Sequence, residues 1–215
     1  MRSFFLILFF TLISLTQAYA QQFYAGAIGG LVLSQIDGDS YGGYHKFAGS
    51  GGLYVRNNFG EKWGYRMELK YIQKGSKAAR LDMGYHTIPF YKASLNYIEI
   101  PFLFSYRMQK FKIPPTIDWQ LDGKLHLNIG MNLSYLFSAT EDDGTGPNEA
   151  GFAFRRIELG AQTGVTYYFS PHWAFDFRFC YTIIPIRDRP NASDLDYWVT
   201  YEFNRVLLFS IMYEI

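Results

Sequence analysis

The sequence predicts an all-β fold, a closed antiparallel up-and-down transmembrane β-barrel of about eight strands. Three observations predict it: apolar and polar side chains alternate along most segments, long and short connections alternate, and aromatic residues gather near both ends of the segments. A period of two is the side-chain period of a β-strand with two different faces. Most segments reach the length of about ten residues that a tilted strand needs to cross a bilayer.

The composition supports one folded domain without a charged binding face. The chain has 215 residues, of which 49% are apolar and 20% aromatic, and its net charge is +1. A chain of this kind can bury a core, and it offers no basic surface for nucleic acid. Because Cys180 is the only cysteine, neither an intramolecular disulfide nor a multi-cysteine metal site is expected.

The first twenty residues have the pattern of a cleaved export signal. Arg2 precedes an apolar run from Phe4 to Leu15, and Ala18-Tyr19-Ala20 forms an A-x-A cleavage site. An uncleaved anchor is less favoured because about 20 apolar residues are needed to span a bilayer. We therefore expect residues 1–20 to be a signal peptide and residues 21–215 to form the barrel domain, which crosses the membrane by strands because no later apolar run could form a spanning helix.

The first four expected strands cover residues 23–33, 47–57, 63–74 and 91–107. Gly26, Gly29 and Gly30 indicate bends or a close backbone approach in the first strand. The third has the clearest two faces, with alternate residues from Trp63 to Tyr71 apolar and the charged residues between them. Pro101 in the fourth predicts a bulge or bend, since proline donates no ladder hydrogen bond.

The last four expected strands cover about residues 124–138, 156–169, 173–183 and 203–215. The fifth has the longest clean alternation, and only Ser170 to His172 separates the sixth from the seventh. Long connections follow strands one, three, five and seven. Short ones follow two and six, and an intermediate one with Pro114-Pro115 follows four. Outer-membrane barrels show this asymmetry, with short periplasmic turns and longer extracellular loops.

Aromatic residues and charges then divide between the two faces of the strands. The expected aromatic belts consist of Trp63, Trp119, Phe169 and Trp173 near the periplasmic side, and Tyr71, Tyr91, Phe137, Tyr181 and Trp198 near the extracellular side. The expected lumen charge network consists of Arg66, Glu68, Lys70, Glu99, Arg107, Arg156, Glu158, Asp176, Arg178 and Glu214. The alternative is a soluble, lipocalin-like barrel with its apolar side chains inward, which accounts less well for the belts and the loop asymmetry.

Three stretches resemble a known family. They are G-G-L-V-L-S-Q-I-D-G-D-S-Y-G-G-Y-H-K-F (29–47), the E-K-W and E-L-K-Y-I-Q-K-G-S-K segments within 61–77, and Y-I-E-I-P-F-L-F (97–104). With the signal sequence, they make the chain similar to the PorT-like outer-membrane barrel proteins of Bacteroidetes. The resemblance implies an outer-membrane location and a role accessory to type IX protein secretion. Many such proteins end in Phe, whereas this chain ends in Ile215, an apolar residue that we expect to signal to the barrel-insertion machinery.

The expected function is that of an integral outer-membrane barrel with a lumen plugged by side chains and a structural or interaction role. Its expected partners are outer-membrane lipid, the insertion machinery and an envelope or secretion-system protein; the barrel is expected to be a monomer without a cofactor. One alternative is a binding module that uses its long loops. Another is a rim hydrolase or acyltransferase built from Asp37, Asp39, His45, Asp82, His86 and Ser40 or Ser76. Cation sites at Asp37 to Asp39 or Glu141 to Asp143 are less favoured than solvated loops.

Overall fold

The computed structural model describes residues 23–39, 41–78, 82–83, 86–87, 90–113, 117–150, 154–188 and 201–215. At 82–83, 86–87, 110–113 and 117–122 it describes the backbone alone. The expected signal peptide lies outside these residues. Among them, no helix combines the length and the apolar character needed to cross a bilayer.

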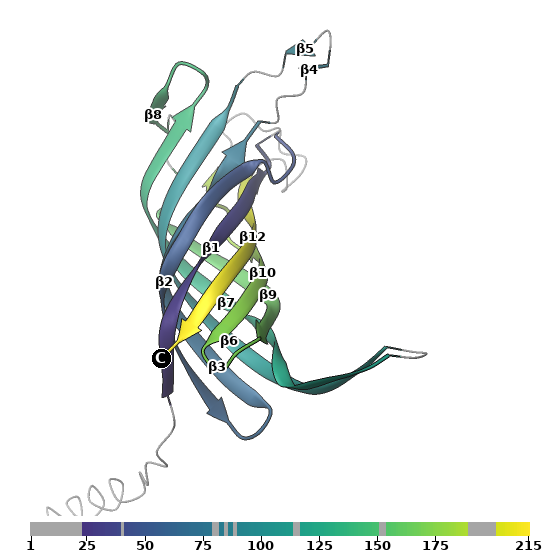
Figure 1. Cartoon of the computed structure of the whole chain (residues 1–215). Coiled ribbons are helices and arrows are strands. Elements are labelled where there is room, and N and C mark those ends of the chain that lie inside the picture. Colours follow the sequence, from purple (N-terminus) through teal and green to yellow (C-terminus); the bar gives the residue numbers. More distant parts are fainter. Residues whose placement is uncertain are drawn as a thin grey trace, which may run out of the picture.

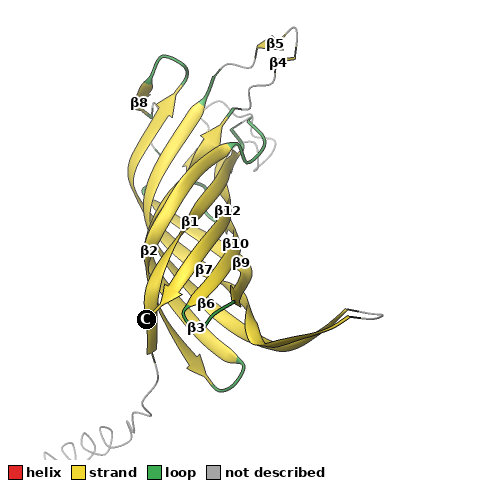
Figure 2. Ribbon diagram, in the orientation of Figure 1, coloured by secondary structure: helices red, strands yellow, loops and turns green. Residues whose placement is uncertain are grey.

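Eight long antiparallel strands form the wall of the barrel (Figures 1 and 2). They are β1 (Phe23–Asp37), β2 (Lys46–Phe59), β3 (Trp63–Lys77), β6 (Lys92–Ile113), β7 (Ile117–Asp142), β9 (Ile157–Tyr168), β10 (Trp173–Thr182) and β12 (Tyr201–Glu214). Each pairs with the next along the chain, and β1 also pairs with β12, from Gly26 opposite Glu214 to Asp37 opposite Phe203. This last pairing closes the sheet, so the first and last strands leave no open edge.

Four short strands lie beyond the wall. β4 (Asp82–Met83) pairs with β5 (His86–Thr87), β8 (Pro147–Glu149) pairs with the end of β7, and β11 (Arg187–Asp188) pairs with the start of β12. All of them belong to the long connections of the sequence, and Figure 1 shows β4, β5 and β8 at the upper end of the barrel. At the opposite end, only three or four residues separate the strands at each of the three connections, which follow β2, β6 and β9. The expected asymmetry between long and short connections is therefore present.

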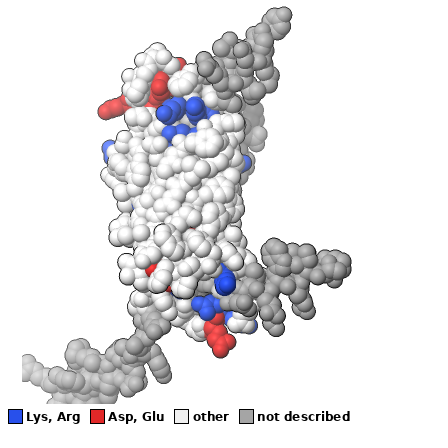
Figure 3. Space-filling model, viewed as in Figure 1, with Lys and Arg blue, Asp and Glu red and all other residues white. Residues whose placement is uncertain are grey.

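The outer face of the barrel is apolar and the inner face polar. Leu53 and Ile129 are 66% and 67% exposed, whereas Glu68 and Asp176 on the other parity are buried. A broad band of the surface almost without charged residues separates the charged groups at the two ends (Figure 3). This is the arrangement of a barrel surrounded by lipid, and the lipocalin-like alternative, which requires apolar side chains inside, is wrong.

Two of the three glycines noted in β1 lie where neighbouring strands approach closely. A Cβ atom would stand 2.1 Å from the Tyr213 carbonyl oxygen at Gly26 and 2.1 Å from that of Phe209 at Gly30, whereas at Gly29 the nearest atom is 3.8 Å away. The close backbone approach therefore occurs at the two glycines on the inward side of β1 and not at Gly29 on its outward side.

The connection between β6 and β7 differs most from expectation. The two strands remain paired beyond the barrel, from Lys110 opposite Gln120 to Ile113 opposite Ile117. The last pair between β7 and β9 is Leu125 with Tyr167, so the hairpin projects away from the wall (Figure 1). The fifth strand therefore begins at Ile117 and not near Lys124, because pairing within the hairpin continues after the barrel wall has ended.

At Pro101, where a bulge or bend was expected, there is no bulge, although Glu68 and Leu69 of β3 have no paired residue in β6. Met67 lies opposite Phe102 and Lys70 opposite Glu99, so the register of β3 and β6 is the same on both sides of the proline. The register shifts of β6 against β7 lie instead between Asn96 and Tyr97 and between Met108 and Lys110. Proline lacks the backbone N–H group and so removes one hydrogen bond from the ladder. The two strands keep their register without this bond, and no extra residue is inserted.

Candidate functional site

Eight buried charged side chains are joined by ion pairs inside the barrel, and we call this set the charge ladder. Four come from β3, one from β6, one from β9 and two from β10. The cations are Arg66, Lys70, Lys74 and Arg178, and the anions are Glu68, Glu99, Glu158 and Asp176. Four positive and four negative groups balance, which reduces the cost of burying them, because a buried charge is costly unless it is paired.

The charge ladder is continuous from Asp176 to Glu158. Asp176 contacts Arg178 at 2.5 Å and Arg66 at 2.7 Å, and both guanidinium groups contact Glu68, at 2.7 and 2.9 Å respectively. Lys70 then joins Glu68 to Glu99, at 3.5 and 3.2 Å. Lys74 joins Glu99 to Glu158, each at 2.6 Å. Every charge in this path except Glu158 therefore contacts at least two opposite charges.

The periodicity of β3 builds one side of the charge ladder. Residues 66, 68, 70 and 74 share a parity, and successive residues of one parity point to the same face of a strand. Their signs vary along the strand, so like charges are interrupted by Glu68. Glu99 completes pairs from the neighbouring strand β6. Glu158 of β9 and Asp176 of β10 complete pairs across the lumen, and these join strands that are not neighbours in the sheet.

Neutral polar groups complete the coordination of the buried carboxylates. Asn132 and Ser134 of β7 donate to Glu99 at 3.1 and 3.0 Å. Asn204 of β12 donates to Glu158 at 2.7 Å, and Thr166 of β9 donates to Asp176 at 2.6 Å. Carboxylate oxygens have several acceptor positions, and these donors occupy positions that the cations leave open.

Seven of the residues expected in the lumen network belong to the charge ladder. Glu214 is also buried, and Arg56 holds it near the lower end with contacts of 2.5 and 2.6 Å. Arg107 is only half-buried at the lower mouth, and Arg156 is exposed before the start of β9. The assignment of Arg156 to the lumen is therefore wrong, because the wall strand begins one residue later. Lys74 was missed as a member of the network, although its parity in the third strand was the available signal.

The extracellular side of the lumen contains an apolar cluster and a second set of ion pairs. Ile72, Leu95, Leu136, Ile186, Val206 and Cys180 are among the buried residues of the cluster. The Cys180 thiol is buried and free, as the small filler expected from the sequence. Arg187 contacts Glu141 at 2.6 Å and Glu202 at 2.8 Å. Burial acts to lower the pKa of Arg187, but the two carboxylates act to raise it, and the net effect is a raised pKa.

The aromatic belt residues divide into those on the outer face and those elsewhere. Trp63, Phe169, Trp173, Tyr71 and Phe137 are between 40% and 53% exposed on the outer parity, and Tyr181 is half-buried on the same parity, stacked on Phe203. Tyr91 packs instead against the interior cluster, and its ring stacks on that of Tyr41 at a centroid distance of 4.6 Å. Its assignment to the belt is therefore wrong, because it shares the inward parity of Ala93 and Leu95. The backbone of Trp119 lies in the projecting hairpin, and Trp198 lies outside the described residues.

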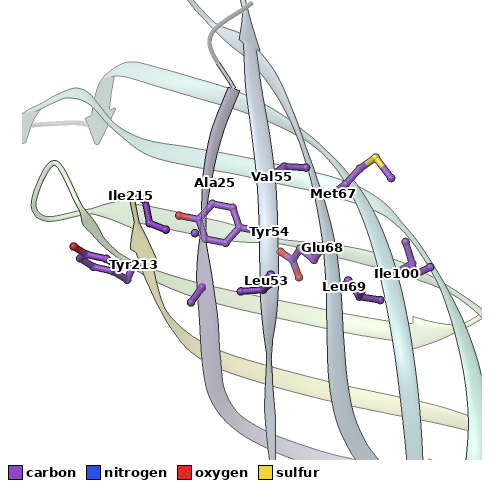
Figure 4. Close-up of a pocket in the computed structure, with 12 residues that line it drawn as sticks. Ala25, Leu53, Tyr54, Val55, Met67, Glu68, Leu69, Ile100, Tyr213 and Ile215 are labelled. Carbon is purple, nitrogen blue, oxygen red and sulfur yellow. The ribbon is translucent and has the colours of Figure 1, made fainter.

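An apolar hollow of about 490 Å³ lies on the lipid-facing side of β1, β2 and β3. Leu53, Val55, Met67, Leu69 and Ile100 line it, with Tyr213 and Ile215 at one edge (Figure 4). Its small residues Ala25, Gly26 and Ala27 leave the surface recessed. The lining suits hydrocarbon chains and contains no arrangement of nucleophile, base and oxyanion donor such as catalysis requires.

The residues considered for a rim enzyme or a cation site have other contacts. Asp37 accepts a hydrogen bond from Gln35 at 2.6 Å and pairs with Arg205. Ser76 is buried, His45 is exposed, and the side chain of His86 and all of Ser40 lie outside the description. Asp142 and Asp143 accept bonds from backbone N–H groups of their own turn. In the part of the chain that the structure describes, no three His, Cys, Asp or Glu side chains gather as a metal site.

A closed sheet with an apolar exterior and a charged interior defines an integral membrane β-barrel. Residues 19–188 match the family described as "Outer membrane protein beta-barrel domain", and the chain belongs to this family. It is an outer-membrane protein.

Solved structures with a similar shape include two bacterial surface proteins. Ail, the attachment invasion locus protein of Yersinia pestis, is 12% identical with a TM-score of 0.47, covering 89% of this chain and 98% of Ail. Neisserial surface protein A is 16% identical with a TM-score of 0.44, covering 90% and 97%. No curated protein sequence matches this chain significantly. At these values we transfer no function from either structure.

Proposed function

We propose that this protein is an outer-membrane barrel whose lumen is plugged by its own side chains and which has a structural or interaction role. The observation that supports the proposal is the charge ladder, which joins β3 to β6, β9 and β10 through contacts of 2.6 to 3.2 Å. The interior of an eight-stranded barrel is about wide enough for its own side chains. A ladder of short contacts across it leaves little room for a hydrated path.

Conductance across a planar lipid bilayer tests the plug. We expect the full-length protein, inserted from detergent, to give no stable conductance steps in 1 M salt, with a boiled sample as the matched control. Stable steps that require the folded protein would contradict a plugged lumen. The result is independent of any partner, so it separates the plug from the interaction role.

For the interaction role, we propose that the protein is accessory to secretion through the outer membrane, as the resemblance to PorT-like proteins implies. The projecting hairpin of β6 and β7 supports this proposal, because paired backbone that extends past the barrel wall offers a surface to an envelope protein. The alternative is a ligand-binding role of the extracellular loops. The observation that favours it is the cluster of Arg187, Glu141 and Glu202, in which β11 of one long connection is held to the extracellular ends of β7 and β12.

Deletion of the hairpin tip distinguishes these two roles. We expect a variant that lacks residues 110–120, joined by a short turn, to fold and to lose a stoichiometric partner in a pull-down under mild detergent. A control variant with the β8 turn (residues 143–146) shortened should keep it. Loss of the partner in the control alone would favour the loop-mediated role. For the rim enzyme, loss of an envelope hydrolase or acyltransferase activity in a His45→Ala/His86→Ala variant would contradict a non-catalytic role.

A further inference from the structure

Three lysines gather at the extracellular ends of β2, β3 and β6, and we call them the rim lysines: Lys46, Lys77 and Lys92. Lys77 of β3 lies directly opposite Lys92 of β6, and both side chains are exposed. Lys77 and Lys92 are close enough to act electrostatically on the Lys46 ammonium group. Basic and acidic residues lie close together at this end of the molecule, above the uncharged band (Figure 3).

A chain of polar side chains connects the rim lysines to the lipid-facing surface. Lys46 donates to Gln73 at 3.1 Å, Gln73 donates to Asn96 at 2.9 Å, and Tyr71 donates to the same Asn96 oxygen at 2.7 Å. Tyr71 is 40% exposed on the outer face, and Leu69, the next outward residue below it, is 57% exposed. The polar groups therefore begin where the apolar face of β3 ends, which is the level of lipid headgroups.

The rim lysines lack ion-pair partners in the described part of the protein. None of the three forms an ion pair with a described carboxylate, and Lys46 is only 3% exposed with an amide as its hydrogen-bond partner. Asp142 lies opposite Lys92 in the register of β6 and β7, but its Oδ1 accepts the Gly144 and Gly146 N–H groups. Like charges directly opposite on two strands destabilise the pair, so an external anion would relieve this repulsion.

We propose that Lys77 and Lys92, the two exposed rim lysines, bind the phosphate group of an anionic lipid in the outer leaflet of the membrane. Two exposed ammonium groups opposite each other can share the oxygens of one phosphate, and charge-assisted hydrogen bonds of this kind are the stronger ones. Tyr71 and Gln73 lie beneath the lysines and can contact the rest of a headgroup. The apolar outer face of β3 and β6, with Leu69, Ile98 and Ile100 exposed, accommodates the acyl chains. A lipid can contact both the lysines and the apolar face below them, whereas a soluble anion can contact only the lysines.

Lipid titration followed by native mass spectrometry tests the proposal on the full-length protein in detergent. The probes are a phosphorylated glucosamine-based glycolipid (lipid A) and the same lipid after removal of its phosphates. We expect the wild type to bind the phosphorylated form at least tenfold more tightly. The K77Q/K92Q variant should lose about 10- to 30-fold in affinity for it, because each lysine near a lipid surface contributes a several-fold effect. Its affinity for the dephosphorylated lipid should not change.

The matched control removes two exposed lysines from the periplasmic end, as K62Q/K124Q, and should bind both lipids like the wild type. Heat-dependent gel mobility verifies that each variant is folded, and the single K92Q variant, with a smaller loss, serves if the double variant does not fold. Equal affinity of wild type and K77Q/K92Q for the phosphorylated lipid would overturn the proposal. Displacement of the lipid by an equimolar amount of inorganic phosphate would overturn it too, since the site would then bind a soluble anion.

Discussion

Arg178 of β10 and Glu68 of β3 face each other across the lumen in a bidentate pair. Nη2 of Arg178 lies 2.7 Å from one carboxylate oxygen and Nη1 lies 3.0 Å from the other, and neither side chain is exposed. The two residues are 110 positions apart in the sequence. A guanidinium group in this geometry fixes both the distance and the orientation of the strands that carry it.

Replacing Arg178 with Met should be strongly destabilising. Glu68 and Asp176 would each lose a buried partner, and removal of one member of a buried ion pair costs about 3–5 kcal/mol. Urea unfolding in lipid vesicles, followed by tryptophan fluorescence, measures the change. The exposed pair of Arg155 with Asp188, at 44% and 60% side-chain exposure, provides the control. Arg155→Met should change stability by no more than about 1 kcal/mol. Similar losses in both variants would contradict a structural role of the charge ladder.

A charge on the lipid-facing surface should prevent membrane assembly. Ile129 is 67% exposed on the outer face of β7, so Ile129→Arg places a guanidinium group in hydrocarbon at a cost of about 2–4 kcal/mol. Ile129→Leu keeps the apolar contact and should fold normally. The fraction of folded barrel in membranes, read from heat-dependent gel mobility, gives the measurement. Full assembly of the arginine variant would mean that this face does not meet lipid.

The close approach at Gly130 predicts a different kind of sensitivity. A Cβ atom there would stand 2.0 Å from the Phe102 carbonyl oxygen of the neighbouring strand, so the backbone would have to move. We expect Gly130→Ala to lower stability by about 1–3 kcal/mol, the usual range for overpacking. At Gly49, no atom lies within 4 Å of the added methyl group, and Gly49→Ala should be nearly neutral. Equal urea midpoints of the two variants would count against the close approach.

Tyr91 should make the extracellular loops sensitive to high pH. Burial and the hydrogen bond that the Tyr91 hydroxyl donates to Glu141 at 2.7 Å raise the pKa of this phenol above its ordinary value. The unfolded chain releases this proton near pH 10, whereas the folded protein retains it to higher pH. The contribution is therefore fully present below about pH 10 and is lost as the pH rises through the raised pKa.

Hydrogen exchange of the loop segments between pH 8 and pH 11.5 measures this loss, after correction for the intrinsic exchange rate. We expect protection in wild type to fall more steeply above about pH 10 than in Tyr91→Phe, which has no proton to lose. Parallel profiles for the two proteins would show that Tyr91 does not link loop stability to pH.

How far the sequence predicts this molecule depends on the element. For β3, β7 and β10, strict alternation of apolar and polar residues predicts both the strand and the side chains that point inward. This is possible because the two-residue period is a local property of the chain. It fails at Tyr91 and Arg156, which lie at strand ends where one residue of shift reverses the face. It also fails at residues 110–113 and 117–120, which flank two prolines that suggested a loop but continue the pairing of the two strands. Pairing depends on the opposite strand, which no local pattern contains.

The sequence by itself determined the class of fold, the apolar exterior and the charged interior, because each follows from side-chain alternation and from the length of chain that crosses a bilayer. Only the tertiary structure decided which charges meet. Lys74 bridges Glu99 and Glu158, and Arg178 pairs with Glu68, because closing the sheet through β1 and β12 brings β3 across the lumen from β9 and β10. These distances depend on the circumference and stagger of the whole barrel, which are properties of all eight strands together.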